Sequence, residues 1–137
     1  MQCLGLGKLG SGVVLIADDE APIRHATKRL LNKMGFEVDL ATDGQEAVEL
    51  FRRNPDRYTL VMLDLTMPGM SGSNVLREIR ELQPSMRVII MSGFSEDDAS
   101  TIMTADDAPN WFLAKPFDFD ALANMIRQVI VDKPAAD

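Results

Sequence analysis

The feature that most constrains the fold is the alternation of short apolar runs with amphipathic stretches. Three runs are apolar nearly throughout: VVLIA at 13–17, TLVML at 59–63 and RVIIM at 87–91. Strands have this composition when both faces of their sheet are covered, whereas a sheet with one wet face gives strict alternation. Two weaker runs, EVDLA at 37–41 and NWFLA at 110–114, are typical of strands nearer the sheet edges.

Helical patterns lie between these runs. Pro22 suits the first turn of one helix, because its fixed φ angle is already helical and the missing N–H has no partner there. Asp43 is expected to cap the second helix, Ser71 or Ser73 the third, and Asp118 the last, whose apolar stripe is the cleanest in the chain.

A further helix is expected from about 95 to 107. Its apolar face is thin, and Asp106 and Asp107 oppose the helix dipole at its C-terminal end. Five strands alternating with five helices predict an α/β fold in which a parallel sheet has helices on both faces.

The composition narrows the classes of function. Acidic residues outnumber basic ones by 21 to 14, for a net charge of -7. No Lys/Arg cluster offers a surface for nucleic acid or anionic lipid, and no apolar run approaches the roughly 20 residues that insert across a membrane. The single cysteine, Cys3, cannot form an internal disulfide, so we expect a cytoplasmic setting.

The length of 137 residues suits one domain. We expect a flexible, Gly-rich leader over 1–12, the domain over 13–132 and a short tail over 133–137.

Polar side chains follow the strands at the edge where a doubly wound sheet places its functional residues. The strand ends carry Asp18 and Asp19, Asp64, Ser92 and Gly93, and Lys115. Taken singly, each is an ordinary loop, turn or surface residue. Their coincidence at one edge indicates a site.

The chemistry of this set indicates phosphoryl transfer. Three clustered carboxylates repel one another unless a cation compensates, and Mg²⁺ accepts a few carboxylates together with water. Lys115 and Ser92 supply the charge and the hydroxyl that an incoming anion needs. Asp64 is then available as a nucleophile.

The sequence also resembles a known family. The segments ADDE (17–20), LDLTMPGMSG (63–72), MSGF (91–94) and FLAKPF (112–117) are similar to the receiver domain of two-component response regulators. The resemblance runs from about residue 13 to residue 131. It implies a flavodoxin-like doubly wound five-stranded parallel sheet, (βα)5, with strand order 2-1-3-4-5.

The resemblance implies a role for each matching residue. Asp64 would be the phosphoacceptor. Mg²⁺, or Mn²⁺ in its place, would be held by Asp18, Asp19, Asp64 and the backbone carbonyl of Thr66. The phosphate contacts would be Ser92, Gly93, Lys115 and Leu65. Ser92 and Phe112 would form the switch, and the Lys115–Pro116 bond would be cis.

The family also implies partners. The phosphoryl donor would be a histidine kinase or a histidine phosphotransfer protein, and the domain would catalyse only its own phosphorylation and dephosphorylation. The output face would comprise the fourth helix, fifth strand and fifth helix, and could also form a homodimer. The MSGFSE and FLAKPF segments resemble receivers of hybrid histidine kinases.

Other functions remain open at this point. A phosphatase of the haloacid-dehalogenase type also uses an aspartyl nucleophile, Mg²⁺ and a lysine, but its second aspartate would stand where this chain has Thr66. A docking module without phosphorylation would lack the acceptor or the acid pair. A flavin-binding protein would need a Ser/Thr/Gly-rich phosphate loop in place of ADDE.

Overall fold

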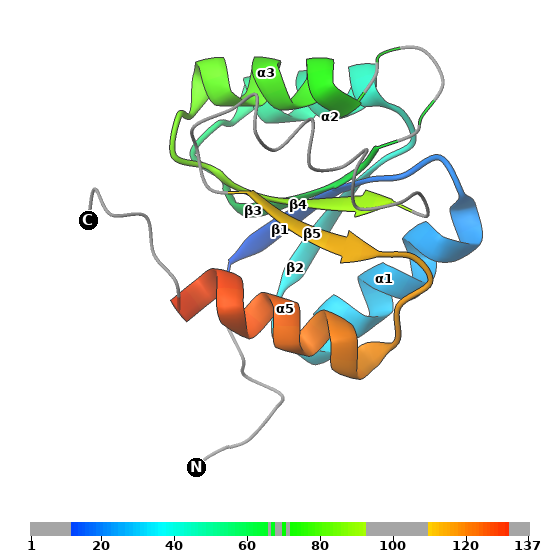
Figure 1. The fold of residues 1–137 in the computed structure, drawn as a ribbon. Helices are drawn as coiled ribbons and strands as arrows, with labels where there is room; N and C mark the ends of the chain where they lie inside the picture. The colour runs from blue at the N-terminus through cyan, green and yellow to red at the C-terminus, as the bar shows by residue number, and fades with distance from the viewer. Residues whose placement is uncertain (1–11, 66, 68–69, 71, 93–109, 132–137) are drawn as a thin grey trace.

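Five parallel strands form one sheet in the order β2-β1-β3-β4-β5 (Figure 1). This computed structural model describes residues 12–65, 67, 70, 72–92 and 110–131. The strands are β1 (Val13–Ala17), β2 (Glu37–Ala41), β3 (Tyr58–Asp64), β4 (Arg87–Ser92) and β5 (Asn110–Ala114). The prediction of a five-stranded parallel sheet in this order is confirmed, and the two weaker runs form its edges.

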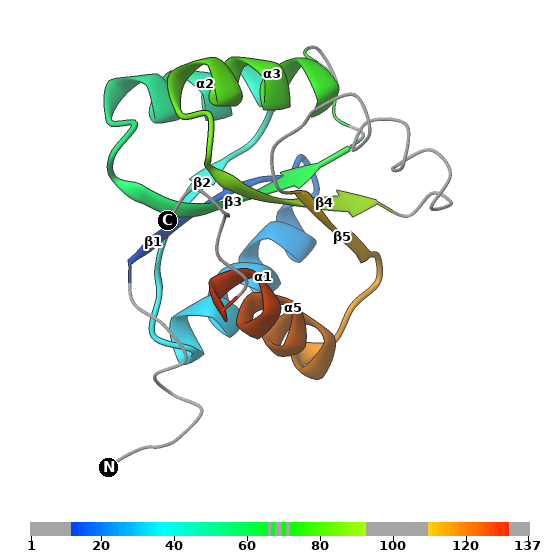
Figure 2. The ribbon, with the colours of Figure 1, turned by 60° about the vertical axis from the view of Figure 1, so that its left-hand side comes forward.

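Helices cover both faces of the sheet, as Figures 1 and 2 show. The described helices are α1 (Ala21–Lys33), α2 (Gly44–Arg53), α3 (Gly72–Leu82) and α5 (Phe119–Val131). α2 and α3 lie on one face, and α1 and α5 lie on the other. The fold is therefore doubly wound.

The central strands divide their side chains between two cores. On β1 and β3, Leu15 and Val61 pack with the buried residues under α2 and α3, and Ile16 and Met62 pack with those over α1 and α5. All four side chains are fully buried. The apolar runs are continuous because each strand is covered on both faces.

The helix ends follow local sequence signals. Asp43 accepts a hydrogen bond from the N–H of Glu46 at 2.8 Å, and Asp118 accepts one from Ala121 at 2.9 Å, so both predicted caps are confirmed. Pro22 lies in the first turn of α1. Ser73 is not the cap of α3, because that helix already begins at Gly72.

Several predictions lie outside the described residues: Ser71, Thr66, Gly93, the helix expected from about 95 to 107, and nearly all of the leader and tail. Within the described ranges, no helix is both long and apolar enough to cross a membrane.

Candidate functional site

The carboxyl ends of three strands bring the predicted charges together. Asp64 is the last residue of β3, and its neighbour across the ladder on β4 is Met91. Asp18 follows β1, where its N–H donates to Ala41 on β2 at 3.2 Å. The N–H of Lys115 donates to Ser92 at 2.8 Å, which extends the pairing of β4 and β5. Backbone hydrogen bonds between the strands thus fix the Cα positions from which these side chains extend.

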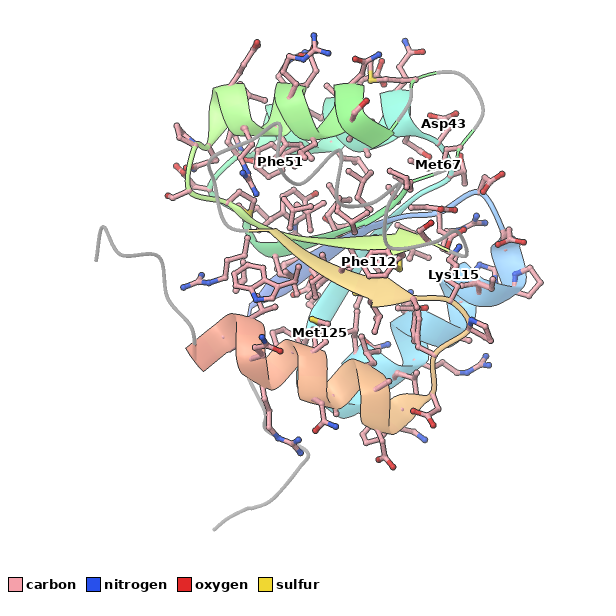
Figure 3. The ribbon with its side chains drawn as sticks, in the orientation of Figure 1. Asp43, Phe51, Met67, Phe112, Lys115 and Met125 are labelled. Carbon is pink, nitrogen blue, oxygen red and sulfur yellow. The ribbon has the colours of Figure 1, made fainter. Side chains whose placement is uncertain are left out.

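Lys115 lies at the centre of the site. Its Nζ atom is 2.9 Å from Asp18 Oδ2, 3.2 Å from Asp64 Oδ2 and 3.3 Å from Glu20 Oε1. Figure 3 shows Lys115 at the end of the sheet that also carries Met67, whereas Phe51 lies toward the opposite end. We call Asp18, Glu20, Asp64 and Lys115 the acidic site.

The members of the acidic site differ in burial. The side chains of Asp18, Asp64 and Lys115 are only 0%, 5% and 11% exposed, while that of Glu20 is 58% exposed. Three carboxylates around one ammonium leave an excess of negative charge in a largely buried place. Such an excess favours binding of a further cation.

The charge of Lys115 is maintained by its surroundings. Burial on its own would lower the pKa of the ammonium, but its contact with Asp18 and the negative charge of Asp64 outweigh burial, so the pKa is raised. Lys115 is therefore a permanent cation at physiological pH.

The turn between β1 and α1 fixes the direction of Asp18. The N–H of Glu20 donates to Asp18 Oδ1 at 2.9 Å, and Arg24 Nη1 donates to the backbone carbonyl of Asp18 at 2.8 Å. Asp18 Oδ2 is buried and meets Lys115 as an ion pair rather than in an aligned hydrogen bond. Asp18 is thus held from both strand and helix.

The acidic site has the donor set of a metal site. Among the residues that the structure describes, one group of three carboxylates is close enough to share an ion: oxygens of Asp18, Glu20 and Asp64 lie within 4.8 Å of one another. Carboxylate oxygens suit a hard divalent cation such as Mg²⁺.

Two adjacent acids behave differently from the sequence prediction. Asp19, predicted as a metal ligand, is exposed and does not belong to the group of three carboxylates, so its role stays a prediction. Glu20 belongs to this group, although the sequence analysis does not identify it as a candidate site residue. The signal that could have found it is the third acid of the ADDE segment.

The remaining predicted residues lie around this edge. Ser92 ends β4 and is fully buried. Phe112 packs partly buried against the core under α2 and α3, and the Lys115–Pro116 peptide is cis. The N–H of Leu65 donates to Met91 at 2.9 Å, and its predicted contact with phosphate stays a prediction.

An apolar pocket of about 210 Å³ adjoins the acidic site. It lies between α1 and the segment that follows β5. Its lining is Pro22, Ile23, Ala26, Thr27, Leu30, Lys115, Pro116 and Phe117. Lys115 thus contributes to both the pocket and the charged site.

Comparison with known proteins gives consistent matches. A family model for the response regulator receiver domain matches residues 14–127. Sensor kinase CckA of Brucella abortus is 35% identical over 121 residues, which are 88% of this chain and 13% of that protein. Sporulation initiation phosphotransferase F of Bacillus subtilis is 32% identical over 117 residues, 85% of this chain and 92% of that protein.

A solved structure shows the same fold. Response regulator protein TrrA of Thermotoga maritima, crystallised in complex with Mg²⁺–BeF, has a TM-score of 0.74 at 33% identity. The alignment covers 86% of this chain and 98% of that one. The chain therefore corresponds to nearly all of TrrA but to only a small part of the Brucella kinase.

Proposed function

Because this chain belongs to the response regulator receiver family, whose members are phosphoacceptor signalling modules rather than true enzymes, we propose that Asp64 accepts a phosphoryl group from a partner's phosphohistidine. The observation that carries the proposal is the place of Asp64. Its carboxylate is nearly buried at the end of β3, 3.2 Å from the Lys115 ammonium and grouped with two further carboxylates.

The transfer is a displacement at phosphorus. A carboxylate oxygen of Asp64 forms the new P–O bond as the P–N bond to the donor imidazole breaks, and the bonding electron pair returns to the imidazole nitrogen. Lys115 offsets the negative charge that gathers on the phosphoryl oxygens, because its raised pKa keeps it protonated.

A divalent cation fits the same place. Asp18 and Asp64 would hold it, and the predicted ligands Asp19 and the Thr66 carbonyl would complete the set, while Glu20 lies beside them on Lys115. When bound, Mg²⁺ or Mn²⁺ would neutralise the carboxylates and allow an anionic phosphoryl group to approach. The Mg²⁺–BeF complex of TrrA supports this choice.

The partner is a histidine kinase or a histidine phosphotransfer protein acting in the cytoplasm. A partner that reaches Asp64 must cover the edge where the apolar pocket opens beside Lys115, so an apolar side chain of the donor would find a place there. The similarity to CckA makes the receiver of a hybrid kinase one candidate context.

The output follows from the predicted switch. Phosphate on Asp64 would draw the Ser92 hydroxyl toward it, and Phe112 would turn into the space. The changed face would be the segment 95–107 with β5 and α5, which would contact a target or a second copy of the domain. A few kcal/mol of differential interaction suffices to shift such a two-state equilibrium.

The direct test is self-phosphorylation by acetyl phosphate with Mg²⁺. Intact mass should rise by one phosphoryl group in wild type and in the control D56N, whose exposed aspartate lies on the loop before β3. D64N and a chelator should each abolish the gain. Labelling that survives D64N would place the acceptor elsewhere. Turnover of a phosphomonoester would favour the phosphatase, and an unlabelled wild type would favour the docking module.

A further inference from the structure

The Lys115 ammonium is surrounded by carboxylates before any phosphoryl group arrives. It carries three N–H groups. Three carboxylates, those of Asp18, Asp64 and Glu20, lie within 3.3 Å of it. Glu20 and Asp64 accept hydrogen bonds from Lys115 and Asp18 meets it as an ion pair, so an oxygen of a phosphoryl group on Asp64 competes with these carboxylates for the ammonium.

Asp18 and Asp64 are poor candidates for displacement. Asp18 is fully buried and is held at its N–H by Ala41, at its carbonyl by Arg24 and at Oδ1 by the N–H of Glu20. Moving it would disturb both β1 and the start of α1. Phosphorylation removes the carboxylate charge of Asp64, but the phosphoryl group that it carries keeps Asp64 beside Lys115.

Glu20 is the contact that is easiest to release. It has the longest of the three distances, 3.3 Å, and a side chain 58% exposed, so water can replace Lys115 on its carboxylate. Exposed ion pairs of this kind contribute little to stability. Although Glu20 is the N-cap residue of α1, its side chain makes no cap hydrogen bond, and within the described residues its carboxylate pairs with Lys115 alone.

We propose that the Glu20 carboxylate occupies the position on the Lys115 ammonium that a phosphoryl oxygen takes after phosphorylation. The carboxylate occupies one N–H of the ammonium in the unphosphorylated protein and is replaced there by a phosphoryl oxygen. Glu20 is a positioning residue that opposes phosphoryl binding, since its carboxylate competes with the phosphoryl oxygen for Lys115. The inference rests on the proposed function of Asp64.

Two substitutions at Glu20 distinguish the effect of its contact with Lys115 from the effect of its negative charge. E20D keeps the charge but is one methylene shorter, and its backbone cannot follow, because the N–H of residue 20 bonds Asp18 and its carbonyl bonds the N–H of Arg24. E20Q keeps the length but removes the charge. E81Q makes the same charge change at an exposed position near the end of α3 and serves as the control.

The measurement is beryllofluoride affinity in Mg²⁺, followed by the fluorescence of the single Trp111 on β5. Loss of a partly screened ion pair should tighten binding about threefold in E20D and roughly three- to tenfold in E20Q, and E81Q should match wild type. Mg²⁺ affinity without fluoride, measured by calorimetry, should change less than beryllofluoride affinity in both variants.

Each other outcome overturns the inference. E20D that binds like wild type while E20Q binds tighter would mean that only the negative charge matters. Weaker beryllofluoride binding in both variants, with weaker Mg²⁺ binding, would make Glu20 a metal ligand instead. D64N separates the two proposals: if D64N abolishes binding while both Glu20 variants bind like wild type, only this inference fails. If D64N binds like wild type, the proposed function fails.

Discussion

Two charged clusters in this protein contain similar residues but differ in how well their carboxylates are matched by cations. The acidic site lies at the carboxyl ends of the strands and places three carboxylates around Lys115. The second, which we call the arginine cluster, consists of Glu37, Asp39, Arg57 and Tyr58 and lies toward the amino ends of β2 and β3.

In the arginine cluster the carboxylates are well matched by donors. Arg57 contacts Asp39 through Nε at 2.8 Å and through Nη2 at 3.2 Å, and Nη2 also reaches Glu37. The Tyr58 hydroxyl donates to Asp39 at 2.7 Å. The hydrogen bond from Arg57 is the main reason why the pKa of Asp39 is lowered.

The difference shows how the choice of cation determines what a cluster can do. A guanidinium presents a rigid fork that suits one geometry, whereas an ammonium is a compact charge on a flexible stem and can change partners. The arginine cluster therefore ties an edge strand to the sheet. The acidic site is more buried and has too little positive charge, which leaves it ready to accept a cation and then an anion.

The largest change in the free energy of unfolding is expected from K115M. It removes the only cation from the acidic site and leaves Asp18 and Asp64 buried together, which should lower the free energy of unfolding by about 3 kcal/mol without Mg²⁺. Saturating Mg²⁺ should restore part of this loss. Urea denaturation with and without Mg²⁺ measures both. An unchanged stability in the absence of Mg²⁺ would mean that the carboxylates do not depend on Lys115.

Mg²⁺ should stabilise the wild type by about 2.7 kcal/mol at 100 times its Kd, provided that it binds only the folded protein. D19N should remove this response if Asp19 turns inward to bind the ion, and it should raise the Tm of the metal-free protein by relieving repulsion. D43N, which changes an acid that caps α2, should keep the Mg²⁺ response. A D19N protein with the full response would mean that Asp19 does not bind the ion.

A smaller loss of stability is expected from D39N in the arginine cluster. Because Asp39 is partly exposed, we expect a loss of only about 0.5–1 kcal/mol at pH 7. The folded-state pKa of Asp39 lies below its unfolded value, so its stabilisation is present above about pH 4 and is lost as the pH falls through the folded-state pKa. Stability curves of wild type and D39N should converge in acid. A difference that persists there would not come from the charge.

The smallest effect concerns Tyr58, the single tyrosine of the chain. Burial and its hydrogen bond to Asp39 raise the pKa of Tyr58 to about 12. Its contribution to stability is therefore present below about pH 10 and is lost as the pH rises through about 12. Ultraviolet difference titration reads this residue directly, and in D39N the midpoint should move toward the usual value. Titration at the usual value in wild type would mean that the hydrogen bond is absent.

Much of the fold was predictable because burial on both faces leaves a clear mark on a sequence. The continuous runs of β1, β3 and β4 identify central strands, and the mixed runs of β2 and β5 identify edges. Since the strands are parallel, their carboxyl ends meet, and this alone predicts that Asp18, Asp64 and Lys115 converge. The strand order itself came from the family resemblance, because alternation does not specify it.

The rest depends on side-chain directions that a linear pattern does not contain. Glu20 and Asp19 are adjacent acids, and only the turn held by Asp18 and Arg24 decides that Glu20 faces Lys115. The arginine cluster was missed because β2 and β3 are separated by β1 in the sheet. Their side chains meet only when the strand order is known.

Lys115 is a residue through which a bound small molecule could affect the acidic site. Its ammonium lies among carboxylates, a setting that repels most anionic compounds, but Lys115 also lines the apolar pocket. An uncharged molecule that fills this pocket would touch the same side chain that holds Asp64. Chemical control of the site therefore does not require a phosphate mimic, and a search for inhibitors should begin with apolar fragments.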